Sequence, residues 1–286
     1  MNLKELKHRI LSVKGTQKIT QAMKLVSSAK LRRAQHAIEG MRPYQSKLEA
    51  MMSAFLHSGG SVCEDYTEQR DVKRAVVIAV ASDTGLCGAF NSNAVRLMRD
   101  TVNEYRSSGA DVELYVVGQK MHDAARRMGF LVNTSLIGES KAPSYSGVAS
   151  VANSLMESFK KGGVDRIEIV YTRFASASRL LPTREIYLPF NVDNVKGGTD
   201  FPLGGYIVEP GREELLHALF PKVIALHLYT ALLDSVAAEH AARMIAMQTA
   251  TDNADELIAE LTLEYNKGRQ QAITNELLDI VAGSNL

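Results

Sequence analysis

The sequence predicts an α/β protein: a long antiparallel coiled coil of the N- and C-terminal helices, plus a doubly wound, mostly parallel, five-stranded Rossmann-like domain. Both ends of the 286-residue chain carry long helical patterns with few helix breakers. Between them, short β-branched runs alternate with helical segments, which is typical of a parallel sheet covered by helices. We expect a coiled-coil helix over 1–57, an α/β domain over 73–205 and a coiled-coil helix over 211–286.

The first helical pattern, over residues 3–57, is interrupted only by two glycines and by Pro43, where a helix can kink. Its apolar positions begin with heptad-like spacing. They are Leu3, Leu6, Ile10 and Val13. Gln17 and Thr20 then stand where apolar residues would continue, so we expect an imperfect seam there.

The expected strands are short and rich in β-branched residues. They are Arg74–Ala81, Asp111–Gly118, Gly129–Ser135, Arg166–Tyr171 and Arg184–Leu188. Helices are expected between them, near Asn93–Arg106, Met121–Met128 and Ser146–Lys161. This alternation predicts a mostly parallel, doubly wound sheet of about five strands that is flanked by helices.

The last helical pattern contains no proline from Lys222 to Ala282. At 1.5 Å per residue that stretch would reach about 90 Å, too long to be wrapped inside a globule of this size. Most positions of its 3,4-spaced series are apolar. The series is Leu216, Leu219, Val223, Leu226, Thr230, Leu233, Ala237, His240, Met244, Met247, Thr251, Ala254, Ile258, Leu261 and Tyr265.

The two ends carry opposite charge, although the net charge is only +1. Met1 to Arg42 holds ten Lys or Arg against two acids, or +8; Glu209 to Leu286 holds five against twelve, or −7. Separate partners for the two ends would explain this, but pairing of the two helices explains it at least as well. If attraction helps to hold the coil together, high salt should lower its melting temperature.

Composition excludes several classes of protein. Cys63 and Cys87 lie far apart and the histidines lack ligand spacing, so we expect no disulfide, no metal and no cofactor. No apolar run approaches the roughly 20 residues that span a bilayer. The basic, amphipathic start resembles a transit peptide, but it continues into a much longer helical pattern, which favours mature protein.

Candidate chemical sites are weak. The loop Ser82–Asn91 follows a strand and precedes a helix, where phosphates often bind, but it lacks the nucleotide-binding glycine spacings. Cys87 has no partner base in a motif, so a buried or interface thiol is the better interpretation. Glu239 and His240 could suggest a metal or acid–base site, but His240 falls on the apolar seam, where a hydrogen-bonded imidazole is commoner than a ligand. Glu256, Glu260 and Glu264 line one solvated or partner-facing stripe of the helix. The basic run of Lys24, Lys30, Arg32 and Arg33 lacks interleaved aromatic residues and has an acidic helix available as partner, which disfavours a nucleic-acid site.

Several segments resemble the γ subunits of bacterial-type F-type ATP synthases. They are Ile10 to Ala34 (ILSVKGTQKITQAMKLVSSAKLRRA), Ser82 to Asn91, Tyr171 to Ser176, Glu239 to Met244, Ala250 to Ala254, Tyr265 to Gln270 and Ile273 to Gly283. The resemblance spans the chain in order. It implies a non-catalytic rotor shaft that turns inside an α3β3 hexamer, contacts an ε subunit and rests on a membrane c-ring driven by protons or sodium ions. The chain would be peripheral, on the cytoplasmic face of a bacterial plasma membrane.

The resemblance also implies site residues. Contacts to the β-subunit catch loops would come from Arg269, Gln270, Thr274 and Glu276. The coupling region would include Met23, Lys24 and Cys87. Cys87 would lie in a loop near an acidic segment of the β subunit. The foot on the c-ring would include Tyr206, Val208 and Glu209. Thr84, Ala89, Gly268 and Ser284 depart from the residues usual in the family, which are Arg, Gly, Ala and Ala.

Two other classes compete with this interpretation. One is a stand-alone enzyme that uses the α/β domain, which should bind nucleotide by itself. The other is a coiled-coil adaptor or nucleic-acid-binding protein without catalytic activity, which would use the basic N-terminal helix. The resemblance favours neither class, and it implies no nucleic-acid partner.

Overall fold

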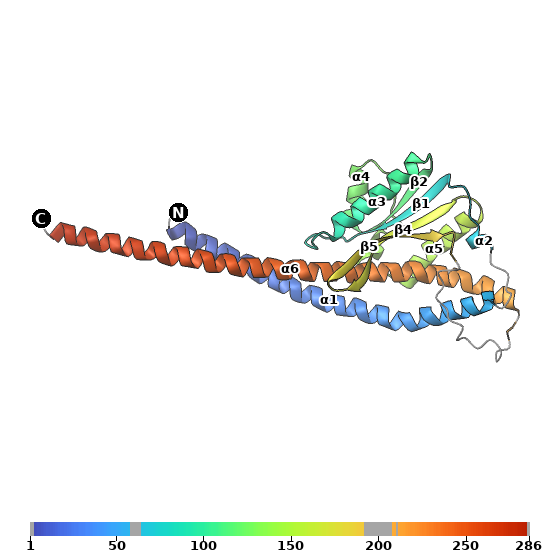
Figure 1. The fold of residues 1–286 in the computed structure, drawn as a ribbon, viewed down its shortest axis with the longest axis horizontal. Coiled ribbons are helices and arrows are strands. Elements are labelled where there is room, and N and C mark those ends of the chain that lie inside the picture. The colour runs from blue at the N-terminus through green and yellow to red at the C-terminus, as the bar shows by residue number, and fades with distance from the viewer. Residues whose placement is uncertain (1–2, 58–63, 192–207, 210, 285–286) are drawn as a thin grey trace. The chain divides into compact units, whose positions relative to one another are not determined.

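The computed structural model describes residues 3–57, 64–191, 208–209 and 211–284 (Figure 1). Within them the elements follow the order α1 Leu3–His57, α2 Glu64–Thr67, β1 Arg74–Val80, α3 Phe90–Ser107, β2 Asp111–Val117, α4 Gln119–Arg127, β3 Val132–Asn133, the 3₁₀ helix η1 Ile137–Ser140, α5 Tyr145–Lys160, β4 Arg166–Ser176, β5 Arg179–Leu188 and α6 Arg212–Ser284. The chain divides into two compact units, one formed by residues 1–28 with 243–286 and one by residues 29–242.

The sheet has five strands in the order β3-β2-β1-β4-β5. β1 lies between β2 and β4 and is parallel to both, and β3 is parallel to β2. Only β5 is antiparallel, and it pairs with β4 at the edge of the sheet. The predicted five-stranded, mostly parallel sheet is therefore confirmed.

Helices cover both faces of the sheet (Figure 1). The side chains of β1 alternate, as in any strand. Val76, Ile78 and Val80 point into a core shared with α5 and with the parts of α1 and α6 that belong to this unit. Ala75 and Val77 point into a second core with α3 and α4. Seven consecutive apolar residues from Ala75 to Ala81 are thus buried, which explains why this strand shows no polar alternation.

A buried charge network links three elements of this unit. Glu168 on β4 is 2% exposed. Its carboxylate accepts hydrogen bonds from the Tyr105 hydroxyl at 2.5 Å and from Nε of Arg184 at 2.5 Å. Arg184, on β5, also pairs with Glu104 on α3. Burial, followed by the Glu168 carboxylate, raises the pKa of Tyr105 to about 12, so this hydroxyl stays a donor at physiological pH.

The two long helices form as predicted, with α1 running through Pro43 and α6 extending over 73 residues through Pro221. In the unit formed by residues 1–28 and 243–286, their contacts run antiparallel. Thr20 and Thr251 are both buried, and their hydroxyl oxygens lie 2.8 Å apart. Gln17 donates a hydrogen bond of 2.5 Å to Asp255. The two polar positions that interrupt the predicted seam therefore meet polar partners on the other helix.

Gly268 provides a test of this packing. A Cβ atom built at Gly268 would lie 3.3 Å from Cδ2 of Leu3, close enough that Leu3 must move by a few tenths of an ångström. Because that atom is the free end of a flexible side chain, we expect Gly268→Ala to stabilise the unit by up to about 1 kcal/mol through helix propensity. Urea unfolding measures the change. A lower midpoint would mean instead that this close approach requires glycine.

Several boundaries differ from the predicted ones. β4 continues as far as Ser176 and β5 begins already at Arg179, so the two strands form a long hairpin. β3, by contrast, spans only two residues. The short helices α2 and η1 were not predicted. An 18-residue window of α6 is also apolar enough to cross a bilayer, with a mean hydropathy of 1.4. That finding corrects the expected absence of such a run. Because 56% of the window is buried inside the protein, however, it has the character of a core helix.

Candidate functional sites

The loop between β1 and α3 is held by side-chain hydrogen bonds. The carbonyl oxygen of Thr84 accepts from the Ser82 hydroxyl at 2.6 Å and from Nδ2 of Asn91 at 3.4 Å. The side-chain oxygen of Asn91 accepts from the Ser82 N–H at 3.1 Å and from its hydroxyl at 2.9 Å. These hydrogen bonds close the loop on itself.

Asp83 links this loop to the start of α4 and to the end of η1. It accepts hydrogen bonds from the Gln119 N–H at 2.9 Å and from the Ser140 hydroxyl at 2.8 Å, and it pairs with Lys141 at 3.1 Å. Burial alone would raise its pKa, but these donors together hold the pKa of Asp83 below its usual value. Its charge is therefore compensated within the chain.

Cys87 is 2% exposed and packs with Phe90 and with Ala238 of α6. Its sulfur accepts a hydrogen bond from Asn91 at 3.2 Å. The predicted buried thiol is confirmed, and no imidazole or carboxylate is among the partners recorded for this sulfur within the described residues. The arrangement anchors the loop at Cys87.

The predicted catch-loop residues lie together near the end of α6, and all four are exposed. They are Arg269, Gln270, Thr274 and Glu276. The helical repeat places Arg269 and Glu276 on one face, seven residues apart, and Gln270 and Thr274 on the neighbouring face. Large apolar side chains are exposed in the same segment, at Ile273, Leu277, Leu278 and Ile280. Because these polar and apolar side chains are exposed in the isolated chain, the surface that they form is available to a partner.

The other predicted site residues are dispersed. Met23 and Lys24 are half-buried on α1. Val208 packs against the core of the α/β unit, and Glu209 beside it is exposed. Tyr206 lies outside the described residues. Among the described residues no cluster of His, Cys, Asp or Glu could hold a metal ion.

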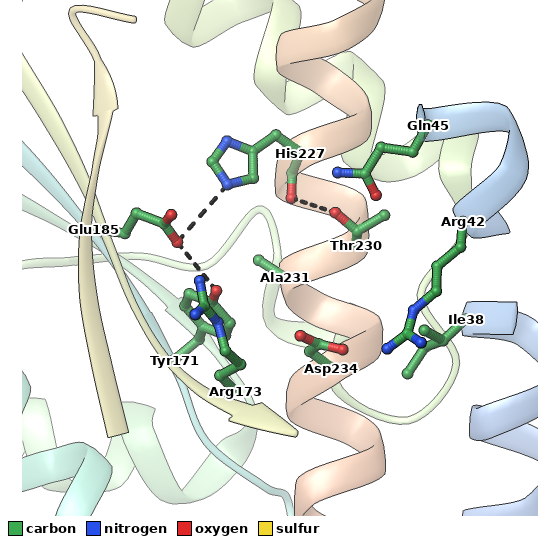
Figure 2. Close-up of a pocket in the computed structure, with 10 residues that line it drawn as sticks. All are labelled: Ile38, Arg42, Gln45, Tyr171, Arg173, Glu185, His227, Thr230, Ala231 and Asp234. Atoms are coloured by element: carbon green, nitrogen blue, oxygen red, sulfur yellow. Dashed lines mark hydrogen bonds and ion pairs between the residues drawn. The ribbon is translucent and has the colours of Figure 1, made fainter. Parts of the chain in front are cut away.

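A polar hollow of about 170 Å³ lies between α1, α6 and the β4–β5 hairpin, and its charged groups come from every wall (Figure 2). Glu185 accepts a hydrogen bond from the Tyr171 hydroxyl at 3.0 Å and faces Nε2 of His227 at 3.7 Å. Chiefly through His227, these contacts hold the pKa of Glu185 below its usual value. Burial and then Glu185 raise the pKa of Tyr171 to about 12.

Asp234 lies between Arg42 and Arg173 in this hollow (Figure 2). None of the described residues gives its carboxylate a hydrogen bond or an ion pair within 4.0 Å. Burial, reinforced by repulsion from Glu185, raises the pKa of Asp234 to about 6, although the two arginines act in the opposite direction. A half-buried carboxylate whose pKa is raised in the folded state opposes folding when it is ionised.

This gives a pH-dependent prediction. Above about pH 6 Asp234 is ionised in the folded protein, and keeping this charge half-buried lowers the free energy of unfolding. In the unfolded chain the same carboxyl has a pKa near 3.8 and ionises without that cost. We expect Asp234→Asn to raise the free energy of unfolding by about 1 kcal/mol at pH 8, a figure discounted for partial exposure. The gain should shrink between pH 6 and pH 4. Urea titrations at several pH values measure it, and a gain independent of pH would contradict the assignment.

Comparison with known proteins identifies the family. A family model described as ATP synthase matches residues 2–285. The chain is 47% identical to the ATP synthase gamma chain of Bacteroides thetaiotaomicron, over 99% of each chain. It is 45% identical to that of Parabacteroides distasonis, over 99% of this chain and 98% of the relative.

Solved structures agree with this result. The central stalk and c-ring structure of Tetrahymena thermophila mitochondrial ATP synthase contains a chain that is 25% identical, with a TM-score of 0.57 over 81% of this chain and 99% of that one. A chain of the Euglena gracilis mitochondrial enzyme, at 18% identity, shares the fold with a TM-score of 0.62 over 99% of this chain and 93% of that one.

The fold and these matches define a central-stalk protein of rotary ATP synthases. The chain belongs to the ATP synthase gamma chain family. Its role is accordingly that of the rotor shaft, a subunit that is not itself catalytic.

Sequence reasoning missed the polar hollow and the Glu168–Arg184 network, because their members lie far apart in the chain and form no motif. It also missed the backbone conformation of Leu86, which has a φ of 60°. The one available signal was the flanking pair Gly85 and Gly88, since glycines often mark loops with left-handed residues.

Proposed function

We propose that this chain transmits torque between a membrane c-ring and a catalytic α3β3 hexamer by biasing the β subunits in turn toward different conformations. One observation carries the proposal: 99% of the chain aligns with 99% of a gamma chain at 47% identity. Agreement over that length supports the same role for this chain.

The mechanism follows from an asymmetric surface. A helix that presents different side chains on different faces interacts unequally with identical β subunits, and so favours a different nucleotide affinity in each. Arg269, Gln270, Thr274 and Glu276 would make directional polar contacts to the β catch loops. The exposed apolar residues near them, such as Leu277 and Ile280, suit rotation within an apolar sleeve.

The remaining proposed contacts lie elsewhere on the chain. Met23, Lys24 and the loop around Cys87 would form the coupling region. Tyr206, Val208 and Glu209 would belong to the foot on the c-ring, with an ε subunit also bound. The complex would place the chain peripherally on the cytoplasmic face of the membrane, where it takes part in proton or sodium transport only through the rotor.

Reconstitution tests the proposal. The purified chain is mixed with cognate α and β subunits, and assembly is followed by native mass spectrometry together with ATPase activity. We expect one copy of the chain to join an α3β3 hexamer and to stimulate its activity. A chain that stays alone and binds nucleotide or nucleic acid by itself would reject the rotor role in favour of an enzyme or an adaptor.

A further inference from the structure

The polar hollow shown in Figure 2 is assembled by the periodicity of its walls, all of which belong to the same compact unit. On α6, His227 and Asp234 lie seven residues apart, about two helical turns, and so share one face. On β4, Tyr171 and Arg173 lie two residues apart and therefore point to the same face of the strand. α1 adds Arg42.

One half of the hollow is satisfied within the chain. Glu185, from β5, accepts a hydrogen bond from the Tyr171 hydroxyl at 3.0 Å and faces His227 at 3.7 Å. The Thr230 hydroxyl donates to the backbone carbonyl of His227 at 3.0 Å. These groups have partners of their own, so they need no ligand.

The other half is not satisfied. Asp234 lies between Arg42 and Arg173 (Figure 2), and neither guanidinium group comes within 4.0 Å of its carboxylate. Arg42 makes no hydrogen bond or ion pair with any residue that the structure describes. Both arginines are exposed, so a dissolved ion can reach them without any opening of the fold. Cationic donors and a carboxylate acceptor thus face the same space without touching.

The donors and acceptors around this space select the chemistry of a ligand. A metal cation would be attracted by Asp234 but repelled by the two guanidinium groups, and a fully deprotonated anion would be repelled by Asp234. An oxyanion that keeps a proton avoids both conflicts. Its charged oxygens accept from Arg42 and Arg173, and its O–H donates to the Asp234 carboxylate. Hydrogen phosphate has this pattern near neutral pH, whereas sulfate does not.

The size of the hollow agrees with a small ion. Its volume of about 170 Å³ is well below the roughly 300–1,000 Å³ of sites that enclose drug-sized ligands, so it is too small to enclose a nucleotide. The titration of Asp234 agrees as well. Burial raises its pKa to about 6 despite both arginines, as expected of a carboxylate that lacks a hydrogen-bond donor. The O–H of a ligand would supply that donor.

We propose that this hollow is a binding site for one hydrogen phosphate ion, which Arg42 and Arg173 hold and Asp234 orients. The bound ion links α1, β4 and α6 at a place where no direct ion pair between the described residues joins Asp234 to either arginine. The site is independent of the proposed rotor role, because it lies within a single unit of the isolated chain.

Calorimetric titration of the full-length chain tests the site. Inorganic phosphate and sulfate are compared at equal ionic strength and about pH 8, where Asp234 is ionised. We expect one phosphate per chain with a Kd of about 1 mM, and at least about tenfold weaker binding of sulfate. Glycerol phosphate distinguishes free phosphate from the phosphate group of a larger molecule. It should bind as weakly as sulfate, because a phosphate monoester has a second pKa of about 6 and has lost its last proton at this pH.

Variants assign the binding to this hollow. Arg42→Met should weaken phosphate binding about tenfold or more. Arg33→Met, at another exposed position of α1, is the matched control and should leave the affinity within about twofold of the parent. Asp234→Asn replaces a carboxylate that only accepts by an amide that also donates. This variant should admit sulfate, so that the preference for phosphate over sulfate falls below about threefold.

Three results would overturn the inference. One is no phosphate binding to the parent chain, which would leave the hollow to water. The second is equal affinity of the parent for phosphate and sulfate, which would mean attraction to the arginines alone. The third is a preference that survives in Asp234→Asn, or an Arg33→Met chain that loses as much affinity as Arg42→Met, since either would place the ion elsewhere. None of these results bears on the rotor role, which reconstitution with α and β subunits tests.

Discussion

Replacing both Arg269 and Gln270 with alanine is expected to reduce ATP synthesis by the assembled complex at least about tenfold, equivalent to losing about 1.4 kcal/mol of interaction in the rate-limiting state. Both side chains are exposed near the end of α6, so the isolated chain should melt at an unchanged temperature. In the proposed contact, the guanidinium of Arg269 and the amide of Gln270 make directional, partly charge-assisted hydrogen bonds to the β subunit, and alanine would remove them.

The matched control uses the same helix. Asn266 and Lys267 are also exposed and are separated from the pair by Gly268 alone, and their double alanine variant should keep ATP synthesis near the parent value. Synthesis and single-molecule torque are measured on complexes of verified composition. An Arg269→Ala, Gln270→Ala complex with full synthesis and undiminished torque would remove these residues from the β contact.

The second large effect concerns stability. We expect Arg184→Met to lower the free energy of unfolding by about 3 kcal/mol, because it leaves the Glu168 carboxylate, which is only 2% exposed, without its charge partner. The hydrogen bond from Tyr105 remains, but a single neutral donor does not offset a buried charge. Urea unfolding of the full-length chain measures the loss.

The double variant Glu168→Leu, Arg184→Met is the control. It removes both charges, so it should recover most of the lost stability and lie within about 1–2 kcal/mol of the parent. The exposed member of the network, Glu104, should matter less, and Glu104→Gln should cost under about 1 kcal/mol. If Arg184→Met unfolded at the parent's urea midpoint, the network would have no structural role.

The central strands could be predicted because their residues form continuous apolar runs rich in β-branched side chains, as in residues 75–80 of β1. The sequence predicts β4 and β5 as separate strands that are shorter than the observed ones, and it does not predict the hairpin that they form. Proline cannot donate to a strand ladder, yet Pro182 lies within β5 opposite Thr172. It is tolerated there because β5 is the edge strand, and that position depends on the order of strands in space.

The candidate sites were harder to predict. Resemblance could mark Arg269 and Cys87, and the sequence already favoured a buried or interface thiol at Cys87. The structure is needed to show that Cys87 is buried in the chain itself and that Arg269 is exposed. The raised pKa of Asp234 depends on how α1, α6 and two strands enclose one carboxylate, and no local pattern encodes that enclosure. The conformation of Leu86 is likewise fixed by Ser82 and Asn91, whose individual identities are unremarkable.

The buried hydroxyl pair of Thr20 and Thr251 has a mechanical consequence. If one helix slipped past the other by seven residues, most apolar seam positions would still face apolar residues, but Thr20 would then face Met244 or Ile258. Each threonine hydroxyl would lose its partner across the seam, and Asp255 would be drawn away from Gln17. The polar layer therefore gives this unit resistance to axial shear, which a uniformly apolar seam would lack.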